Sequence, residues 1–567
     1  MKDQNQTVHD YVLDKGGRLL ADKITLPQGS LIDPSVLRIE RTYTIRGQLS
    51  TITSYDAATG GNAKNQLKFA YNDFGQTLES AQDHFGVVTG SSPMVQYDYE
   101  PGTAGHVRPT TTVYPNGDEV RYAYGTADEA GDVANRVVAL KDYQLASQTE
   151  TTVAEYEYLG LGRVVEADLP VPELRLDYDS GTAGQYAGFD RFGRVVDHRW
   201  ETHADVPVAR IGHGYDRNGN RFYRKDFVAG VAELDEFYDY DDLNRVTQLR
   251  RGAVDLELVE FQSETEKWKE SWTLDALGNW GYYEQMVDND VTQLAQSRAH
   301  SKANEVTGLT GGSWATPAHD RAGNMTTIPK PNTPTVGYTV TYDAWNRLLK
   351  LEDGETTVVI YAYDGLNQRI VKTLGNPASP DEIRHFYYND RWQCLEERLE
   401  SGSTLSGYAD CRYVWGARYV DDLILRQRDT SSPKDGTLDE TLYALQDANY
   451  NVVALAQPNG TIAQRFIYDA YGKVTELNAN FTPYSGSGLA WEYLCVLSAS
   501  VYESSAGICY RWLPGEISWR MIDEQDQGRR VGEAGEGSAS VRPVASHASS
   551  PIAAARIAVG RGGRVGA

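Results

Sequence analysis

Runs of aromatic and β-branched residues recur along the chain, and many of them end in the same turn signal. Residues 336–342 (VGYTVTY) and 356–363 (TTVVIYAY) are typical runs, and their composition favours strands. The recurring unit is aromatic, any residue, aromatic, Asp, two variable residues, Gly or Asn, Arg or Asn, and an aliphatic residue. Weaker copies lie at residues 11–19 and 71–78. The clearest copies place their turn residues at Asp190 and Gly193, Asp216 and Gly219, Asp241 and Asn244, Asp275 and Gly278, Asp320 and Gly323, Asp343 and Asn346, Asp364 and Asn367, and Asp469 and Gly472.

This unit predicts a β-hairpin. Aromatic side chains two positions apart lie on one face of a strand. Asp at the first turn position and Gly or Asn three residues later are preferred in tight turns, because Asp accepts backbone hydrogen bonds and Gly or Asn tolerates positive φ. One hairpin cannot bury its aromatic face alone, but stacked copies can. We therefore predict an all-β chain of stacked antiparallel hairpins that form a spiralling sheet.

Composition supports this prediction. The chain of 567 residues contains 37 Tyr and 53 Gly but only 5 Met, which is typical of strands and turns rather than helix bundles. Few stretches could hold a helix; residues 256–272 are one of them. The repeat position of the tyrosines favours packing within the sheet over an exposed aromatic surface for sugars or protein partners, although both interpretations stay open.

Charge and hydropathy exclude several classes of protein. The net charge of −25 opposes nucleic-acid binding by the field of the whole protein. No apolar run is long enough to predict a membrane span, and residues 1–10 show no apolar core of a signal peptide. Neither Cys394 with Cys411 nor Cys495 with Cys509 has the spacing of a C-x-x-C metal or redox pair, so we expect incidental thiols.

The repeats resemble those of the RHS, or YD-repeat, family, over roughly residues 9–475. Residues 413–426 (YVWGARYVDDLILR) look like the stretch that precedes the RHS core, and residues 442–455 and 464–474 look like the first half of the core. The resemblance implies a sheet wound into a hollow β-cocoon. In bacterial polymorphic toxins and insecticidal toxin complexes of this family, the shell encloses a variable C-terminal toxin. In many members the core domain releases that toxin by aspartyl autoproteolysis, whereas the animal teneurins use the shell in adhesion.

The C-terminal part departs from the family pattern. Residues 502–508 and 519–523 echo core elements, but Glu524 and Asp526 replace the expected Pro and Gly, and residues 494–500 match nothing in the pattern. Beyond residue 530 the chain is rich in Ala, Gly, Ser and Arg and lacks aromatic residues, so it is predicted to be disordered. A degraded or frameshifted gene end and a genuine flexible tail are the two explanations. We predict three parts: a repeat shell at 1–400, a core-like region at 401–526 that is degenerate after about 490, and a low-complexity tail at 527–567.

Candidate catalytic chemistry is sparse. Asp523 is the only residue that the resemblance offers as a proteolytic candidate, and an aspartyl dyad also needs a second carboxylate that shares its proton. A surface acidic pair with Asp526 is the alternative. His198 and His203 do not have the spacing of H-E-x-x-H, and the acidic turn at 216–219 lacks the remaining ligands of a calcium loop. We expect no cofactor and no metal, and an enzyme is the less favoured class.

Three functions follow from the sequence and the resemblance. The first is a non-enzymatic shell or scaffold fragment of a secreted or surface RHS protein, which would encapsulate and deliver a C-terminal toxin that is absent from this chain. The second is a cell-surface or wall-associated adhesin that binds glycans or proteins, and the third is an aspartyl autoprotease of the core. The partners implied are an encapsulated toxin, export machinery, or a cell-surface glycan or protein. Nucleic acid is not among them.

Overall fold

A computed structural model describes residues 1–484, except 103, 104, 106, 231–233, 258, 259, 289, 290, 331, 332, 403 and 471, together with two short strands, β39 (Ser500–Glu503) and β40 (Ile508–Arg511). Nearly all regular structure is β, in one sheet of 23 strands and one of 15. The predicted all-β fold of stacked antiparallel hairpins is therefore confirmed. Among the described residues, no helix is long and apolar enough to cross a membrane.

The larger sheet, here called the first winding, contains the N-terminal half of the chain. Its strands are β1 (Val8–Leu13), β2 (Leu19–Thr25), β3 (Arg38–Tyr43), β4 (Leu49–Tyr55), β5 (Ala63–Tyr71), β6 (Thr77–Asp83), β7 (Met94–Pro101), β8 (Val107–Val113), β9 (Glu119–Ala123), β10 (Ala139–Gln144), β11 (Thr149–Leu159), β12 (Arg163–Leu169), β13 (Leu174–Asp177), β14 (Asp197–Thr202), β15 (Pro207–Tyr215), β16 (Arg221–Asp226), β17 (Asp235–Tyr240), β18 (Val246–Asp255), β19 (Glu260–Gln262), β20 (Trp268–Leu274), β21 (Trp280–Val287), β22 (Val291–His300) and β23 (Val306–Thr310). The short α1 (Ala130–Val133) joins β9 to β10. In the described part of the stretch 256–272, which could have held a helix, β19 and the start of β20 flank the 3₁₀ turn η2 (Ser263–Thr265).

The smaller sheet, here called the second winding, continues the same pattern. Its strands are β24 (Ala318–His319), β25 (Met325–Pro329), β26 (Gly337–Tyr342), β27 (Leu348–Asp353), β28 (Thr356–Tyr363), β29 (Arg369–Asn376), β30 (Ser379–Tyr388), β31 (Cys394–Ser401), β32 (Thr404–Leu405), β33 (Cys411–Trp415), β34 (Leu423–Arg428), β35 (Glu440–Gln446), β36 (Val452–Ala456), β37 (Ile462–Tyr468) and β38 (Val474–Asn478). Strands that follow one another in the chain pair antiparallel, as do β28 and β29, except that β33 pairs with β31 instead of the short β32. The sheet runs without a break past residue 400, because β31 pairs with β33.

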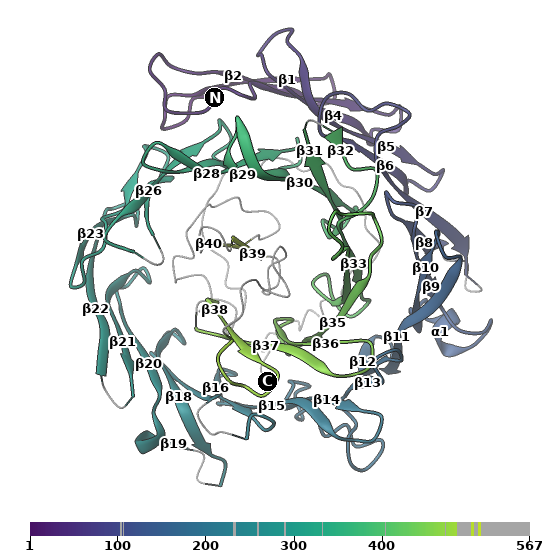
Figure 1. The fold of residues 1–567 in the computed structure, drawn as a ribbon, viewed down its shortest axis with the longest axis vertical. Helices are drawn as coiled ribbons and strands as arrows, with labels where there is room; N and C mark the ends of the chain where they lie inside the picture. The colour runs from purple at the N-terminus through teal and green to yellow at the C-terminus, as the bar shows by residue number, and fades with distance from the viewer. Residues whose placement is uncertain are drawn as a thin grey trace, which may run out of the picture.

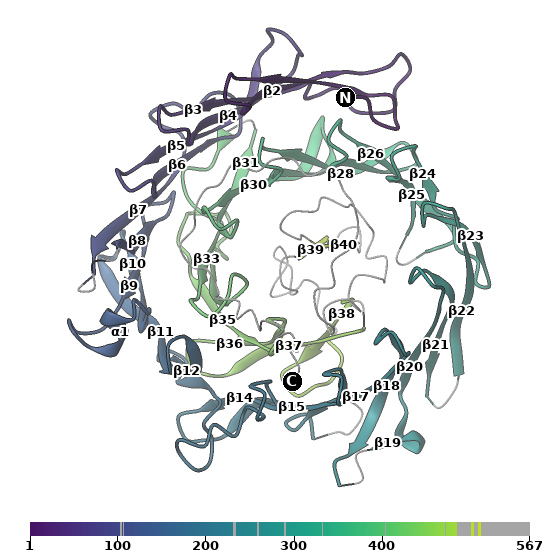
Figure 2. The ribbon, with the colours of Figure 1, turned by 180° about the vertical axis from the view of Figure 1, so that it is seen from behind.

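The chain winds around a common centre as a narrowing spiral. The first winding forms the outer wall, and the second winding lies inside it, with β28–β30 facing β1–β6 and β33 facing β7–β10 (Figures 1 and 2). Hydrogen bonds that join the windings span 323 positions at Trp345–Asp22 but only 200 at Ala470–Glu270. One turn of the spiral therefore uses fewer residues toward the C-terminus.

The two ends of the hairpins form the two edges of the wound sheet. We call the edge with the Asp-containing turns the tip edge, and the opposite edge the far edge. The tips of the second winding lie against the far edge of the first winding, where the tip residue Asp343 forms a parallel bridge with Asp33 and Asn65 Nδ2 donates to the carbonyl of Tyr363 at 3.0 Å. The boundary along which these edges meet is the seam.

Apolar side chains from both windings share the largest core. Leu140 and Val153 of the first winding pack in one cluster with Val414 and Leu445 of the second. Each fully buried aliphatic side chain of this kind contributes about 1.5–3 kcal/mol relative to exposure. The windings are therefore joined by an apolar core as well as by hydrogen bonds.

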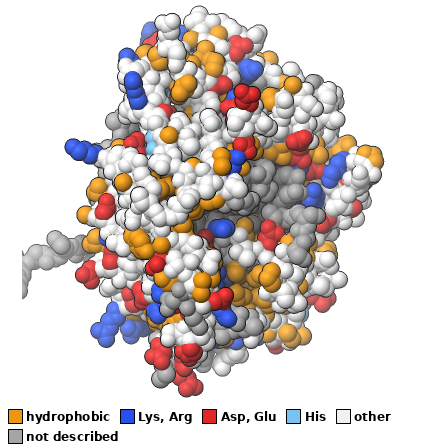
Figure 3. Space-filling view, turned by 60° about the vertical axis from the view of Figure 1, so that its left-hand side comes forward, with side chains coloured by type: hydrophobic (Ala, Val, Ile, Leu, Met, Phe, Trp, Pro, Cys, Tyr) orange, Lys and Arg blue, Asp and Glu red, His pale blue; other side chains and the backbone are white. Residues whose placement is uncertain are grey.

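On the face shown in Figure 3, the described acidic and basic side chains are interspersed rather than gathered by sign.

Two of the four cysteines have side chains that the structure describes. Cys394 and Cys411 are both free and buried. Burial raises the pKa of the Cys411 thiol to about 12, so this group stays protonated and unreactive near neutral pH. Cys495 and the side chain of Cys509 lie outside the described residues, and the prediction of incidental thiols stays a prediction for them.

Candidate functional site

The hairpin tip is the structural unit in which the repeat residues meet. At residues 190–194, Gly193 N–H donates to the carbonyl of Asp190 at 2.9 Å and adopts a φ of 78°. One Asp190 carboxylate oxygen accepts from the backbone N–H groups of Phe192 and Arg194, at 2.9 Å each, and the other accepts from Arg194 Nε at 2.7 Å. A single aspartate thus satisfies three donors, which explains why the unit combines Asp, Gly and Arg at this spacing.

The other predicted turn residues lie in turns of the same kind. The first-position aspartates that accept the backbone N–H four residues later are Asp216, Asp241, Asp275, Asp320, Asp343, Asp364 and Asp469. The fourth-position residues with positive φ are Gly219, Asn244, Gly278, Gly323, Asn346, Asn367 and Gly472. Each predicted pair therefore meets in one turn.

Further tips were missed by the sequence pattern. Thr44, Asn389 and Asp447 each begin a turn of the same hydrogen-bonding pattern. In two of them a bulky residue has positive φ where Gly or Asn is expected, namely Trp392 at 67° and Tyr450 at 64°. The sequence signal that could have found two of these turns is the tyrosine directly before them, which is Tyr43 before Thr44 and Tyr388 before Asn389.

The tyrosine that directly precedes a turn has its own hydrogen bond. Tyr363 Oη donates to the carbonyl of Leu348, which begins the returning strand of the previous hairpin, at 2.7 Å. The same bond, between 2.6 and 2.9 Å long, is made by Tyr43, Tyr71, Tyr215, Tyr240, Tyr342, Tyr388 and Tyr468. Tyr99, Tyr124 and Tyr158, which lie near strand ends without this turn, also donate to a backbone carbonyl of a neighbouring hairpin. We call this series the tyrosine ladder. It joins each hairpin to its predecessor.

Replacing one rung of this ladder is expected to cost about 1–2 kcal/mol of unfolding free energy. In Tyr363→Phe the ring stays, but the buried carbonyl of Leu348 loses its donor. Urea unfolding followed by tryptophan fluorescence would measure the loss. Tyr11→Phe is the matched control, because Tyr11 is 45% exposed and its hydroxyl only approaches Met1 Sδ at 3.9 Å. Equal midpoints for the two variants would contradict a stabilising ladder.

The residue that follows the Gly or Asn position reaches the next tip. Arg245 pairs with its own Asp241, and its second nitrogen donates to the carbonyl of Asp275 at 2.7 Å. Asn324 also joins its own tip to the next one, since its Nδ2 donates to both Asp320 and Asn346 Oδ1 at 2.8 Å. The position therefore needs a side chain with several donors, and Arg and Asn provide them.

The tip at residues 343–347 of the second winding is buried, whereas the tip at residues 190–194 of the first winding is not. The side chains of Asp343 and Arg347 are each 1% exposed, whereas those of Asp190 and Arg194 are 18% and 30% exposed. Trp345, between the two buried residues, donates from Nε1 to Asp22 of the first winding at 2.9 Å. The same turn thus serves as a hairpin end in one winding and as an anchor at the seam in the other.

The seam contains buried charges that cross from one winding to the other. Arg412 of β33 is fully buried and pairs through its terminal nitrogen with Asp142 of β10 at 2.6 Å, while its Nε lies 3.5 Å from Asp118. Its guanidinium also lies 4.4 Å from the ring centre of Tyr114. Tyr114 Oη donates to the carbonyl of Tyr413 at 2.7 Å. This cluster fixes the second winding on the first at a defined register.

Two buried carboxyl groups at the seam titrate near neutral pH. Burial raises the pKa of Asp364 to about 7, and among the described residues its Oδ2 has no hydrogen-bond donor, since Gln368 stands where other turns have Arg or Asn. Burial, and then the charge of Asp469, raises the pKa of Glu270 to about 7. Tyr283 Oη donates to Glu270 at 2.7 Å. Both groups are structural parts of the seam.

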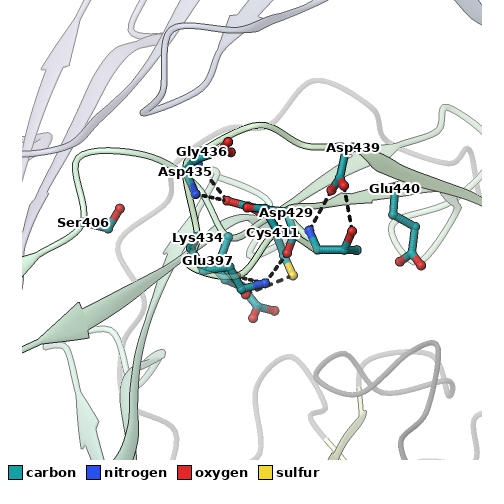
Figure 4. A network of polar contacts seen from close by, with 12 residues as sticks. Glu397, Ser406, Cys411, Asp429, Lys434, Asp435, Gly436, Asp439 and Glu440 are labelled. Carbon is teal, nitrogen blue, oxygen red and sulfur yellow. Dashed lines mark hydrogen bonds and ion pairs between the residues drawn. The ribbon is translucent and has the colours of Figure 1, made fainter.

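A polar network surrounds the loop between β34 and β35 (Figure 4). Asp429 Oδ2 accepts from the backbone N–H groups of Asp435 and Gly436 at 2.9 and 2.7 Å. Burial alone would raise the pKa of Asp429, but hydrogen bonds from Ser431 and Gly436 lower it. The ionised carboxylate therefore holds the loop closed on itself.

The same network contains two carboxylates, Glu397 and Asp410, that share one cation. Arg384 lies between Glu397 and Asp410, with its terminal nitrogen 2.8 and 2.7 Å from their carboxylate oxygens. Lys434 adds a second cation 3.0 Å from Asp410. Burial would raise the pKa of Asp410, but Arg384 and Lys434 lower it. An ionised carboxylate beside two cations cannot share a proton in a dyad, so this geometry stabilises structure rather than catalysis.

The two histidines and the aspartate that the sequence offered as metal-binding or catalytic residues do not form a site among the described residues. His198 contacts Tyr178 Oη and the carbonyl of Gln446, whereas His203 contacts Asp168. Within the described residues, no group of three or more His, Cys, Asp or Glu side chains is arranged to hold a metal ion. Asp523 lies outside the described residues, and its proteolytic role stays a prediction.

The wound sheet is similar to solved structures of toxin-complex proteins. The crystal structure of TcdB2-TccC3-TEV superposes with a TM-score of 0.59 at 14% identity, over 90% of this chain and 25% of that one. The structure of the Photorhabdus luminescens Tc holotoxin pore gives a TM-score of 0.59 at 13% identity, over 94% of this chain and 27% of that one. This chain shares their fold. No family model matches the sequence, and no curated protein matches it either.

The similarity to the solved structures covers only part of their chains. This chain spans about a quarter of the length of the solved chains, and the identity is low enough that the likeness concerns the fold alone. The crystal structure of TcdB2-TccC3 without its hypervariable C-terminal region is also similar, with a TM-score of 0.57. The wound hairpin sheet is therefore the common feature, and activity and partners need separate arguments.

Proposed function

We propose that this chain is a non-enzymatic shell segment of an RHS-type secreted or surface protein, built to enclose and deliver a C-terminal toxin. The observation that carries the proposal is the narrowing spiral, in which one continuous series of hairpins forms an outer and an inner wall around a common centre (Figure 1). The similarity to the Tc holotoxin pore structure supports it. The sequence division into a shell at 1–400, a core-like region at 401–526 and a tail at 527–567 belongs to this proposal.

The use of the tyrosines favours a shell over an adhesin. In the tyrosine ladder, as at Tyr240 and Tyr388, hydroxyl groups donate to backbone carbonyls of the adjacent hairpin. A glycan-binding surface needs exposed aromatic faces with polar groups that are free to bind ligand. The ladder instead employs both the ring and the hydroxyl within the wall, which suits a protein whose main task is to remain closed.

Protease protection of a C-terminal cargo would test the shell function. The full chain is extended after Ala567 with a short unstructured epitope, and proteinase K digestion is followed by immunoblotting at pH 7.5. Because the proposal places cargo within the wall, we expect the epitope to be lost at least about tenfold more slowly than from the same peptide carried on an unrelated folded protein.

The control places the same epitope before Met1. N-terminal and C-terminal epitopes have equal intrinsic sensitivity, so any difference in cleavage rate reports their location. Equal rates at the two ends, both as fast as for the peptide on the unrelated protein, would contradict enclosure. The circular dichroism of both extended proteins must match that of the parent chain.

A further inference from the structure

Two buried histidines from different windings meet face to face at the seam. His84 follows β6 at the far edge of the first winding, and His385 lies in β30 of the second. Their Nδ1 atoms are 3.0 Å apart, and their rings are stacked with planes 8° apart. His84 is 9% exposed and His385 is 1% exposed. The contact therefore joins residues 301 positions apart in a site that is largely shielded from water.

The hydrogen bonds around the pair define which nitrogen carries each proton. His385 Nε2 lies 2.9 Å from Glu400, and a carboxylate can only accept, so His385 carries its proton on Nε2. His385 Nδ1 is then an acceptor, and His84 must donate to it from Nδ1. His84 Nε2 is left buried, with no hydrogen-bond partner among the described residues. The neutral pair thus forms a directed chain from His84 through His385 to Glu400.

The groups packed around the pair oppose additional positive charge. Arg398 lies directly opposite His385 in the pairing of β30 with β31, and its charge disfavours protonation of His84. The ring of Tyr387 stacks on His84 with centres 4.7 Å apart, and Phe85 contacts His385 at 5.2 Å. Asp83, Glu396 and Glu400 are nearby carboxylates, of which Glu396 pairs with Arg398 and Glu400 binds His385 directly. One carboxylate in contact can balance one imidazolium but not two.

We propose that His84 and His385 form a proton-operated latch that joins the two windings when it holds at most one extra proton and releases them when it holds two. The first proton is accommodated, because protonated His385 donates from Nδ1 while His84 shifts its own proton to Nε2. A second proton leaves two imidazolium rings stacked in a buried site, with N–H groups facing each other. The two charges then repel, and hydration of either ring requires the seam to open.

The direction of the pKa shifts agrees with this geometry. Burial lowers the pKa of His84 well below the usual range, and His385 and Arg398 lower it further. Burial also lowers the pKa of His385, although Glu400 opposes that shift. The folded pair therefore binds protons less tightly than the unfolded chain does. Its contribution to stability is present above the ordinary histidine pKa of about 6.5 and is lost as pH falls through the lowered values.

The latch is distinct from the shell function, since it concerns the contact between windings whether or not the wall encloses a cargo. Hydrogen exchange of the full chain, followed by mass spectrometry at pH 7.5 and pH 4.5 and corrected for intrinsic rates, would test it. Peptides covering residues 77–88 and 379–388 report on the two sides. We expect their protection in the wild type to fall at least about tenfold on acidification.

The deciding variant is His84→Asn, whose side-chain amide replaces the Nδ1 donor without a titratable group. It should keep these peptides protected at pH 4.5. The loss of protection between pH 7.5 and pH 4.5 should therefore be at least about fivefold smaller than in the wild type. His203→Asn is the control, because His203 is exposed and pairs with Asp168 away from His84. It should behave like the wild type.

Two results would overturn the latch. One is a wild type whose seam peptides lose no protection at pH 4.5, and the other is a His84→Asn variant that loses as much as the wild type does. If His84→Asn fails to fold at pH 7.5, His385→Asn serves instead, because its amide oxygen can accept from His84 Nδ1 and it carries no second charge. The same outcomes then apply to that variant.

Discussion

Replacing Arg412 with alanine is expected to lower the free energy of unfolding by about 3–5 kcal/mol. The guanidinium is fully buried and lies 2.6 Å from Asp142 and 3.5 Å from Asp118, so its removal leaves two carboxylates at the seam without their cation. The cost comes from these uncompensated buried charges more than from the lost attraction. Urea unfolding followed by tryptophan fluorescence would measure it, together with hydrogen exchange of β10 and β33.

The matched control for this effect is Arg46→Ala. Arg46 pairs with Asp73 at 3.0 Å, but the two side chains are 57% and 93% exposed, and an exposed pair of this kind contributes only about 0–1 kcal/mol. In Arg412→Ala we also expect protection against hydrogen exchange to fall on both sides of the seam. In the same variant, the protection of the tips around Arg46 should stay unchanged. A loss below 1 kcal/mol would show that the windings do not depend on this cluster.

The tips could be predicted from sequence because their chemistry is local. All interactions that define the turn at Asp190 lie within five consecutive residues, so the spacing of Asp, Gly and Arg contains the information. The turn at 389–393 escaped for a local reason too, because Asn389 replaces Asp and Trp392 takes the positive φ. A broader definition of the turn that keeps the preceding tyrosine would have found it.

The seam could not be predicted from the sequence. Nothing near Arg412 in the chain indicates Asp142, and nothing near His84 indicates His385, because these pairs depend on how many residues one turn of the spiral takes up. That number depends on loop lengths and changes along the chain. The sequence pattern likewise favoured packing of the tyrosines over an exposed binding surface, but it did not reveal the bond from the hydroxyl of Tyr363 to the preceding hairpin. That role requires the register of neighbouring strands.

The turn at 364–368 shows how similar repeat sequences acquire different properties from their surroundings. Asp364 Oδ1 accepts the N–H groups of Leu366 and Gln368 at 2.8 Å, as in other tips. The tip lies at the seam, however, with Gly365 against Ile52 and Ile39 of the first winding. Burial therefore raises the pKa of Asp364 to about 7, whereas Asp190, in an exposed tip, has a lowered pKa. Only the wound structure separates the two cases.

This difference makes Asp364→Asn a pH-dependent stabilising substitution. With a folded pKa of about 7 against 3.8 for the unfolded chain, the proton on Asp364 contributes stability that is fully present below about pH 4 and is lost as pH rises through 7. Between pH 5 and pH 8 the wild type should lose about 2–3 kcal/mol through this group. Asparagine keeps the Oδ1 acceptor and does not ionise, so the variant should gain about that much relative to the wild type over the same interval.

Urea unfolding of both proteins at pH 5 and pH 8 would measure the effect as a difference of differences, which removes the shared contribution of Glu270. Asp190→Asn is the matched control, because a lowered pKa keeps Asp190 ionised in both states throughout this range. Its effect on stability should therefore be the same at both pH values. If Asp364→Asn also shifted stability equally at pH 5 and pH 8, Asp364 would have to be ionised or hydrated at the seam. The second winding could then not lie as tightly on the first as the burial of this tip requires.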